Sequence, residues 1–86
     1  MTHLFNFSKE YFELIKSGEK NFILTKRDRP YKNGDEIVIQ EIDEGFGLTS
    51  DELRFKITLV ESGEGIKSNY CIIAICPQDY IKKHEN

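Results

Sequence analysis

The chain has 86 residues, of which 38% are hydrophobic and 31% charged, and its formal net charge is −3. This length predicts a single domain over residues 1–86 with a modest core, and no apolar run is long enough for a transmembrane span or a secretory signal. The acidic balance argues against broad, non-specific binding to duplex nucleic acid, because domains that hold DNA by its phosphates are usually basic.

The first predicted elements are a strand from His3 to Phe7 and a short helix from about Ser8 to Ser17. Ser8 is a typical N-cap residue, and Gly18 is a typical helix stop. Within the helix, apolar side chains recur at the spacing of one helical face and predict core contacts for that face: Tyr11, Phe12, Leu14 and Ile15.

The rest of the chain predicts four more strands, over Lys20 to Lys26, Asp35 to Asp43, Glu52 to Glu61 and Tyr70 to Cys76. In the fourth strand, alternation predicts one buried face made of Leu53, Phe55, Ile57 and Leu59. The fifth strand is almost wholly apolar, which indicates a central strand covered on both faces and ended by Pro77. We expect loops over Glu44 to Asp51 and Ser62 to Asn69, and a polar tail over Asp79 to Asn86 with a Tyr80-Ile81 contact pair.

This order of elements predicts an α+β fold, namely a small, partly closed β-barrel of five or six strands with the helix across one opening. The predicted buried residues are Phe12, Ile15, Phe22, Leu24, Ile37, Ile39, Phe55, Ile57, Ile73 and Ile75.

The two cysteines, Cys71 and Cys76, are five positions apart in a predicted strand, so they point to opposite faces and cannot bridge. We therefore expect reduced thiols and a cytoplasmic protein. Their spacing matches no zinc ribbon, and His3 and His84 stand isolated near the two ends of the chain. We expect no metal, cofactor or membrane partner, and no glycine pattern matches a phosphate-binding loop.

Charge is distributed unevenly along the chain. Residues 16–32 hold six cations against two acids, whereas residues 33–66 hold nine acids against two cations. Such asymmetry bears on partners rather than on fold. Both segments could also be ordinary solvated loops and strand faces, and this alternative stays open.

Several short motifs occur in a characteristic order: a first strand with His3, then Ser17-Gly18-Glu19-Lys20, Asp28-Arg29, Gly34-Asp35 and Glu41. In this order they resemble the small PUA-like domains of the ASCH superfamily, and most closely a short bacterial and phage subfamily without an assigned function. The resemblance extends from His3 to Ile75. It implies a PUA-like β-barrel with a cleft for RNA or a nucleotide, and in some relatives an amidohydrolase acting on acylated cytidine.

The segment after Lys20 departs from this family. Relatives often carry an acid or a hydroxyl residue where this chain has Ile23, and an arginine where it has Thr25. A catalytic lysine or water needs a polar partner to position it or to take its proton, and isoleucine does neither. We therefore predict no catalytic residues and a binding role.

The predicted function is binding of single-stranded RNA or a nucleotide-like ligand at a basic cleft. Lysine and arginine neutralise phosphates and tyrosine stacks on bases, and the predicted binding residues are Lys20, Lys26, Arg27, Arg29, Tyr31 and Lys32. For Arg29, pairing with Asp28 or Asp35 is an equally good interpretation. For Tyr31, packing over the mouth of the barrel is favoured over stacking on a base.

Two alternatives come from other functional classes. One is a divergent amidohydrolase acting on a modified nucleoside, in which Glu41 or another acid within reach of Lys20 replaces the missing partner. The other is a phage-type protein-interaction or inhibitor module that offers an acidic face to a basic protein partner. The excess of acids over residues 33–66 motivates the second alternative. It would be favoured if the acids of the Glu44 to Glu52 loop lay on one contiguous face, and weakened if they were scattered.

Overall fold

The computed structural model describes residues 1–43, 45 and 47–78. Its elements in chain order are the strand β1 (Thr2–Ser8), the helix α1 (Lys9–Lys16), and the strands β2 (Phe22–Lys26), β3 (Glu36–Asp43), β4 (Gly47–Glu61) and β5 (Tyr70–Pro77). The predictions for the tail, Asp79 to Asn86, lie outside the described residues. In the part that is described, no helix is long and apolar enough to cross a membrane.

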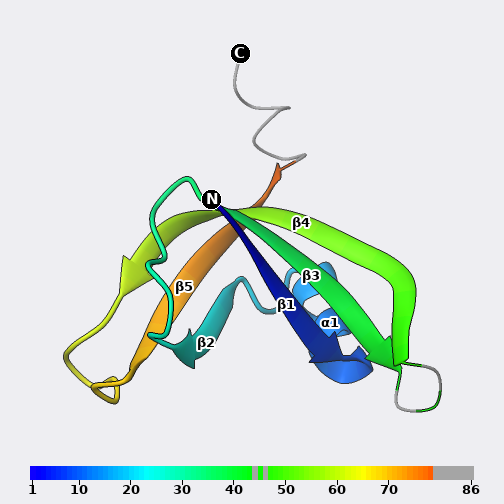
Figure 1. Ribbon diagram of the computed structural model, residues 1–86, viewed down its shortest axis with the longest axis horizontal. Helices are drawn as coiled ribbons and strands as arrows, with labels where there is room; N and C mark the ends of the chain where they lie inside the picture. Colours follow the sequence, from blue (N-terminus) through cyan, green and yellow to red (C-terminus); the bar gives the residue numbers. More distant parts are fainter. Residues whose placement is uncertain (44, 46, 79–86) are drawn as a thin grey trace.

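The five strands form one curled sheet in the order β1-β3-β4-β5-β2 (Figure 1). β1 runs parallel to β3, and the other neighbouring strands are antiparallel. Since β1 and β2 are the two edges, the sheet is a half-barrel with an open side between them. The predicted α+β class and barrel-like sheet are therefore confirmed.

The helix α1 begins and ends where the sequence predicted. The hydroxyl of Ser8 accepts a hydrogen bond from the backbone N–H of Tyr11 at 3.4 Å, which is the N-cap arrangement. Gly18 follows the helix with a φ of +84°, a conformation that favours glycine. The helix lies against β1 and β3 and buries Phe12 and Ile15. Its placement across an opening of the barrel stays a prediction.

The core fills the inner side of the half-barrel. Eight of the ten predicted core residues are buried, but Phe22 is 40% and Leu24 54% exposed, so those two predictions were wrong. Their neighbour Ile23 is fully buried, because it pairs with the inward-facing Ile73 of β5. β2 therefore has the opposite inside–outside phase from the one expected, and its three consecutive apolar residues gave no alternation to fix that phase.

β4 differs from its predicted form at both ends. It begins at Gly47 rather than Glu52, and Gly47 and Leu48 pair with Asp43 and Ile42 of β3, where a loop was expected. Near its other end the pairing with β5 shifts between Ile57 and Leu59. Such a β-bulge reverses the alternation that follows it. Leu59, predicted to be buried, is consequently 47% exposed, and Val60 packs against the core instead.

β5 lies inside the sheet, between β4 and β2, and ends at Pro77 as predicted. We predicted that both faces of β5 would be covered, but only the inner face is. Cys71, Ile73 and Ile75 are buried, whereas the alternate residues on the outer face are only half-buried. The described structure has one helix, which packs its apolar face with the inner core. Cys71 and Cys76 are free thiols on opposite faces of this strand, as predicted.

Candidate functional site

Five aromatic rings, three of them on β1, lie in a row along the open side of the half-barrel. His3, Phe5 and Phe7 come from β1, Tyr11 from α1, and Tyr31 from the segment after β2. We call these five residues the aromatic row. Its ring centroids are 4.7 Å apart for His3 and Tyr31, 6.2 Å for Tyr31 and Phe5, 5.7 Å for Phe5 and Phe7, and 4.1 Å for Phe7 and Tyr11.

One end of the aromatic row is closed and the other is partly open. His3, Phe5 and Tyr31 are buried, at 2%, 9% and 9% exposure, whereas Phe7 and Tyr11 are half-buried. The closed end is fixed by a hydrogen bond between His3 Nε2 and Asp35 Oδ2 at 2.9 Å. The accessible part of the row is therefore the end formed by Phe7 and Tyr11.

A cation lies over each part of the aromatic row. At the open end, Lys20 Nζ is 4.1 Å from the centroid of Tyr11 and 5.1 Å from that of the exposed Phe22. Towards the closed end, the guanidinium carbon of Arg29 is 5.5 Å from the centroid of Phe5. Cations at these distances from ring centroids are attracted by the ring faces. The row thus holds two positive charges at the open side of the sheet.

Tyr31 is built into the core rather than presented to a ligand. Its ring packs between His3 and Phe5, and burial raises the pKa of its phenol although a hydrogen bond with Thr25 opposes this. Of the two interpretations given for this residue, the structure shows the packing one. Arg29 Nε is 4.0 Å from the exposed Asp28 carboxylate, an ion pair of little energetic weight.

The other predicted cations take different positions. Arg27 and Arg29 line a cavity of about 220 Å³ together with Tyr31. Lys26 is exposed at the end of β2, on the outer face, and Lys32 is exposed in the segment before β3. The structure thus gathers Arg27, Arg29 and Tyr31, places Lys20 at the open end of the aromatic row, and leaves Lys26 and Lys32 apart.

Sequence reasoning missed three residues of this site, namely Phe7, Tyr11 and Phe22. The helical spacing of Tyr11 indicated core packing, and Phe22 was assigned to the core. A signal for Phe22 existed in the Gly-x-Lys-x-Phe spacing, which places an aromatic residue two positions after Lys20. This spacing alone does not show whether Phe22 points into the core or to the outer face of β2.

No described carboxylate lies within ion-pair distance of Lys20. Glu41, the acid considered as its partner, is 8% exposed and is paired in the sheet register with Phe7 of β1. Ile23 points into the core at 0% exposure. Among the described residues, no group of three or more potential metal ligands comes together.

The described acids of residues 33–66 have different surroundings. Asp35 and Glu41 are buried, whereas Glu36 and Glu52 flank Arg54, at 3.4 Å and 2.9 Å. Asp51 is in the first half of the long strand β4, and Glu61 is the last residue of that strand. These different surroundings weaken the acidic-face alternative, which stays a prediction.

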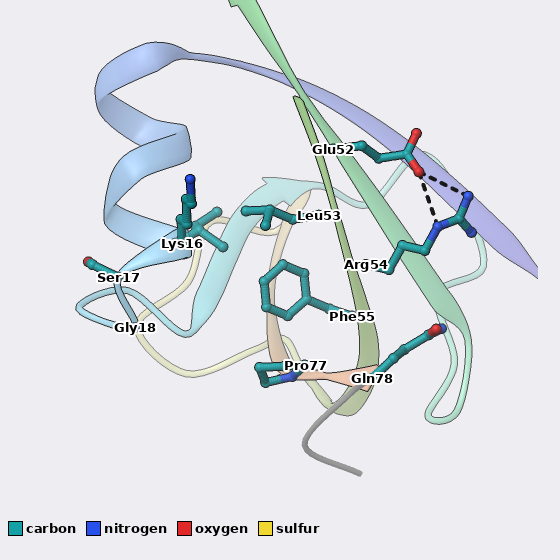
Figure 2. A pocket seen from close by; sticks show the side chains of 10 residues that line it. Lys16, Ser17, Gly18, Glu52, Leu53, Arg54, Phe55, Pro77 and Gln78 are labelled. Carbon is teal, nitrogen blue, oxygen red and sulfur yellow. Dashed lines mark hydrogen bonds and ion pairs between the residues drawn. The ribbon is translucent and has the colours of Figure 1, made fainter. Parts of the chain in front are cut away.

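A larger cavity, of about 490 Å³, lies away from the aromatic row, at the carboxyl end of α1 (Figure 2). Lys16 and the turn at Ser17 and Gly18 lie on one side of it, and Leu53 and Phe55 point towards them from β4. Arg54 also lines this cavity, and its Nη2 is 2.9 Å from Oε2 of Glu52. None of the predicted binding residues lines this cavity.

The fold and the site together define a small α+β domain with an aromatic and basic open side. Residues 2–75 match the family described as Domain of unknown function (DUF3850), and the chain belongs to that family. The match includes α1, all of β1 to β4 and most of β5. A comparison with curated proteins gave no significant match.

Proposed function

We propose that this chain is a PUA-like binding domain that takes single-stranded RNA or a nucleotide-like ligand at the open side of its half-barrel. The observation that carries the proposal is the position of Lys20, a half-buried cation between the rings of Tyr11 and Phe22. A base can stack on an accessible ring while a cation binds the neighbouring phosphate, which is how many proteins hold single strands.

In this proposal the stacking residue is Phe22 rather than Tyr31. Phe22 is 40% exposed and lies beside Lys20, whereas Tyr31 is 9% exposed and packed between other rings. Lys20 and Arg29 supply the charge for phosphates. Because the protein as a whole is acidic, we expect modest affinity that falls as salt rises.

Two features of the site, the surroundings of Lys20 and the burial of Ile23, support binding rather than hydrolysis. Lys20 is positioned by aromatic rings and has no described carboxylate within ion-pair distance. Ile23 is wholly buried, so no polar group reaches Lys20 from that position. A general base must lie within hydrogen-bond reach of the proton that it takes. We therefore expect little or no hydrolysis of acylated cytidine.

The test is a fluorescence-anisotropy titration with a short, labelled single-stranded RNA at several salt concentrations. Phe22→Ala should weaken binding by about 1–3 kcal/mol and leave the salt slope unchanged, because stacking releases no counterions. Lys20→Ala should weaken binding and reduce the salt slope by about one unit. The matched controls are Leu24→Ala, an exposed apolar residue on the same face of β2, and Lys56→Ala, an exposed cation of β4.

Wild-type protein that does not bind at high micromolar concentration, where a basic control protein binds, would refute the proposal. So would equal losses in Phe22→Ala and Leu24→Ala, because these would show a general effect of trimming β2. Rapid turnover of acylated cytidine that Lys20→Ala abolishes would instead favour the amidohydrolase.

A further inference from the structure

The cavity of about 220 Å³ adjoins the aromatic row. It is lined by Arg27, Arg29, Pro30, Tyr31, Val60, Ser62 and Cys71. Tyr31 packs against the rings of His3 and Phe5, and the guanidinium of Arg29 lies over the ring of Phe5. Through these two residues the cavity and the row form one continuous site.

The cavity is suited to an anion. Among the described residues, the two charged ones that line it are both arginines and no acid lines it. Ser62, another lining residue, carries a hydroxyl group as a further polar partner. A planar guanidinium offers two parallel N–H donors to a phosphate, which makes arginine a strong ligand for that group. The nearest acid in contact, Asp28, has a side chain that is 61% exposed and only a 4.0 Å contact with Arg29.

Arg27 is held in place without being neutralised. Its Nη1 donates a hydrogen bond to the carbonyl oxygen of Ser68 at 3.3 Å, and its backbone N–H donates to the carbonyl of Asn69. These contacts fix the residue and leave further N–H groups for a ligand. Burial raises the pKa of the Cys71 thiol although the charge of Arg27 opposes this, so near neutral pH the cavity holds no thiolate that would repel an anion.

Size limits what the cavity accepts. Its volume of about 220 Å³ is below the roughly 300–1,000 Å³ of typical small-molecule pockets. A cavity of that size can hold a phosphoryl group, while a ribose and base would extend through its open side. A phosphodiester within a strand is bonded to a nucleoside on each side, so the strand would have to pass into the cavity and out again. A terminal phosphate is bonded to one nucleoside only. The rest of the nucleotide then stays outside, near the aromatic row.

We infer that the cavity between Arg27 and Arg29 binds the terminal phosphate monoester of a nucleotide or short single strand. The inference rests on the proposed function, because it assigns one end of the ligand that the open side would hold. Arg27 and Arg29 bind the phosphate oxygens, and Ser62 donates from the rim. The domain then distinguishes a phosphorylated strand end from a hydroxyl end.

The experiment uses a five-nucleotide uridine RNA in three forms: with a 5′-phosphate, with a 3′-phosphate, and with hydroxyl groups at both ends. Each phosphorylated form carries its fluorophore at the end opposite to the phosphate, and it is compared with the hydroxyl form labelled at that same end. For the wild-type chain we expect one of the phosphorylated forms to bind about tenfold more tightly than the hydroxyl form, as one or two charge-assisted hydrogen bonds would give. Anisotropy titrations at one fixed salt concentration measure the ratio.

Arg27→Ala should weaken binding of the phosphorylated form more than binding of the hydroxyl form, so that the ratio of the two affinities falls towards one. Arg27→Lys keeps the charge but loses the planar pair of donors, so it should retain only part of the preference. Lys67→Ala is the matched control, an exposed cation from a neighbouring loop that does not line the cavity. Circular dichroism checks that each variant is folded.

The two proposals fail in different ways. If the wild-type chain binds all three RNAs equally, the terminal-phosphate inference is wrong and the proposed function stands. If it binds none of them, the proposed function itself fails. A preference that persists in both Arg27→Ala and Arg29→Ala would show that the phosphate is bound outside this cavity.

Discussion

Asp35 links the start of β1 to the segment before β3 through hydrogen bonds of its carboxylate. His3 Nε2 donates to its carboxylate at 2.9 Å, and the backbone N–H of Lys32 donates at 3.1 Å. The bond from His3, with a smaller effect from Lys32, lowers the pKa of Asp35 although burial opposes this. Since His3 also packs on Tyr31, this carboxylate positions the closed end of the aromatic row.

The pH dependence of stability should report this carboxylate. A lowered pKa in the folded state means that its stabilisation is complete above the ordinary pKa, about 3.9, and is lost as the pH falls through the lower folded value. Asp35→Asn should cost about 1–3 kcal/mol at pH 7 and reduce the loss of stability in acid. Urea titrations at pH 7 and near pH 3 measure both effects. The exposed acid Asp51, changed to Asn, is the control, and identical acid sensitivity in the two variants would contradict the assignment.

At the scale of elements, β2 has the most consequential geometry. It is an edge strand that pairs with β5, and it buries Ile23 while exposing Phe22 and Leu24. This phase is what places Phe22 beside Lys20 at the open side. The opposite phase would bury the proposed stacking ring and expose a core isoleucine.

Neighbouring alanine substitutions test the phase of β2. Ile23→Ala should lower the free energy of unfolding by about 2–5 kcal/mol, the usual cost of emptying a core position. Leu24→Ala, which removes as many carbon atoms from a side chain that is 54% exposed, should cost far less. Denaturant titrations of the two variants give the comparison, and similar losses, or a larger loss for Leu24, would mean that the strand faces the other way.

For the molecule as a whole, stability should not depend on a disulfide. Cys71 and Cys76 are free thiols that point to opposite faces of β5, so no bond between them can form without breaking the strand. The melting temperature should therefore be the same with and without a reductant at fixed protein concentration. A clear drop on reduction would require another pairing, such as a bond between two copies of the chain.

Local patterns in the sequence predicted the helix and the approximate strands, because Ser8, Gly18, Asn33-Gly34 and Pro77 act through their immediate neighbours. They did not predict the phase of β2, the bulge after Ile57 or the start of β4 at Gly47, because each of these depends on which residue lies opposite in another strand. The cations of the site were visible as a charged segment. Which of them meet, and that Phe22 lies beside Lys20 while Tyr31 is buried, depends on how distant segments fold together.

The pairing of β2 with β5 also has a consequence for the order in which the protein folds. Residues 27–69 separate the two strands, and the described residues offer β2 no other strand partner. A ribosome releases β2 well before β5, and contacts between distant segments form slowly. During synthesis the apolar run Phe22-Ile23-Leu24 therefore stays without its partner until β5 has been synthesised. The segment that carries the proposed binding residues would then be the last part of the sheet to be completed, and the one most exposed to chaperones while it waits.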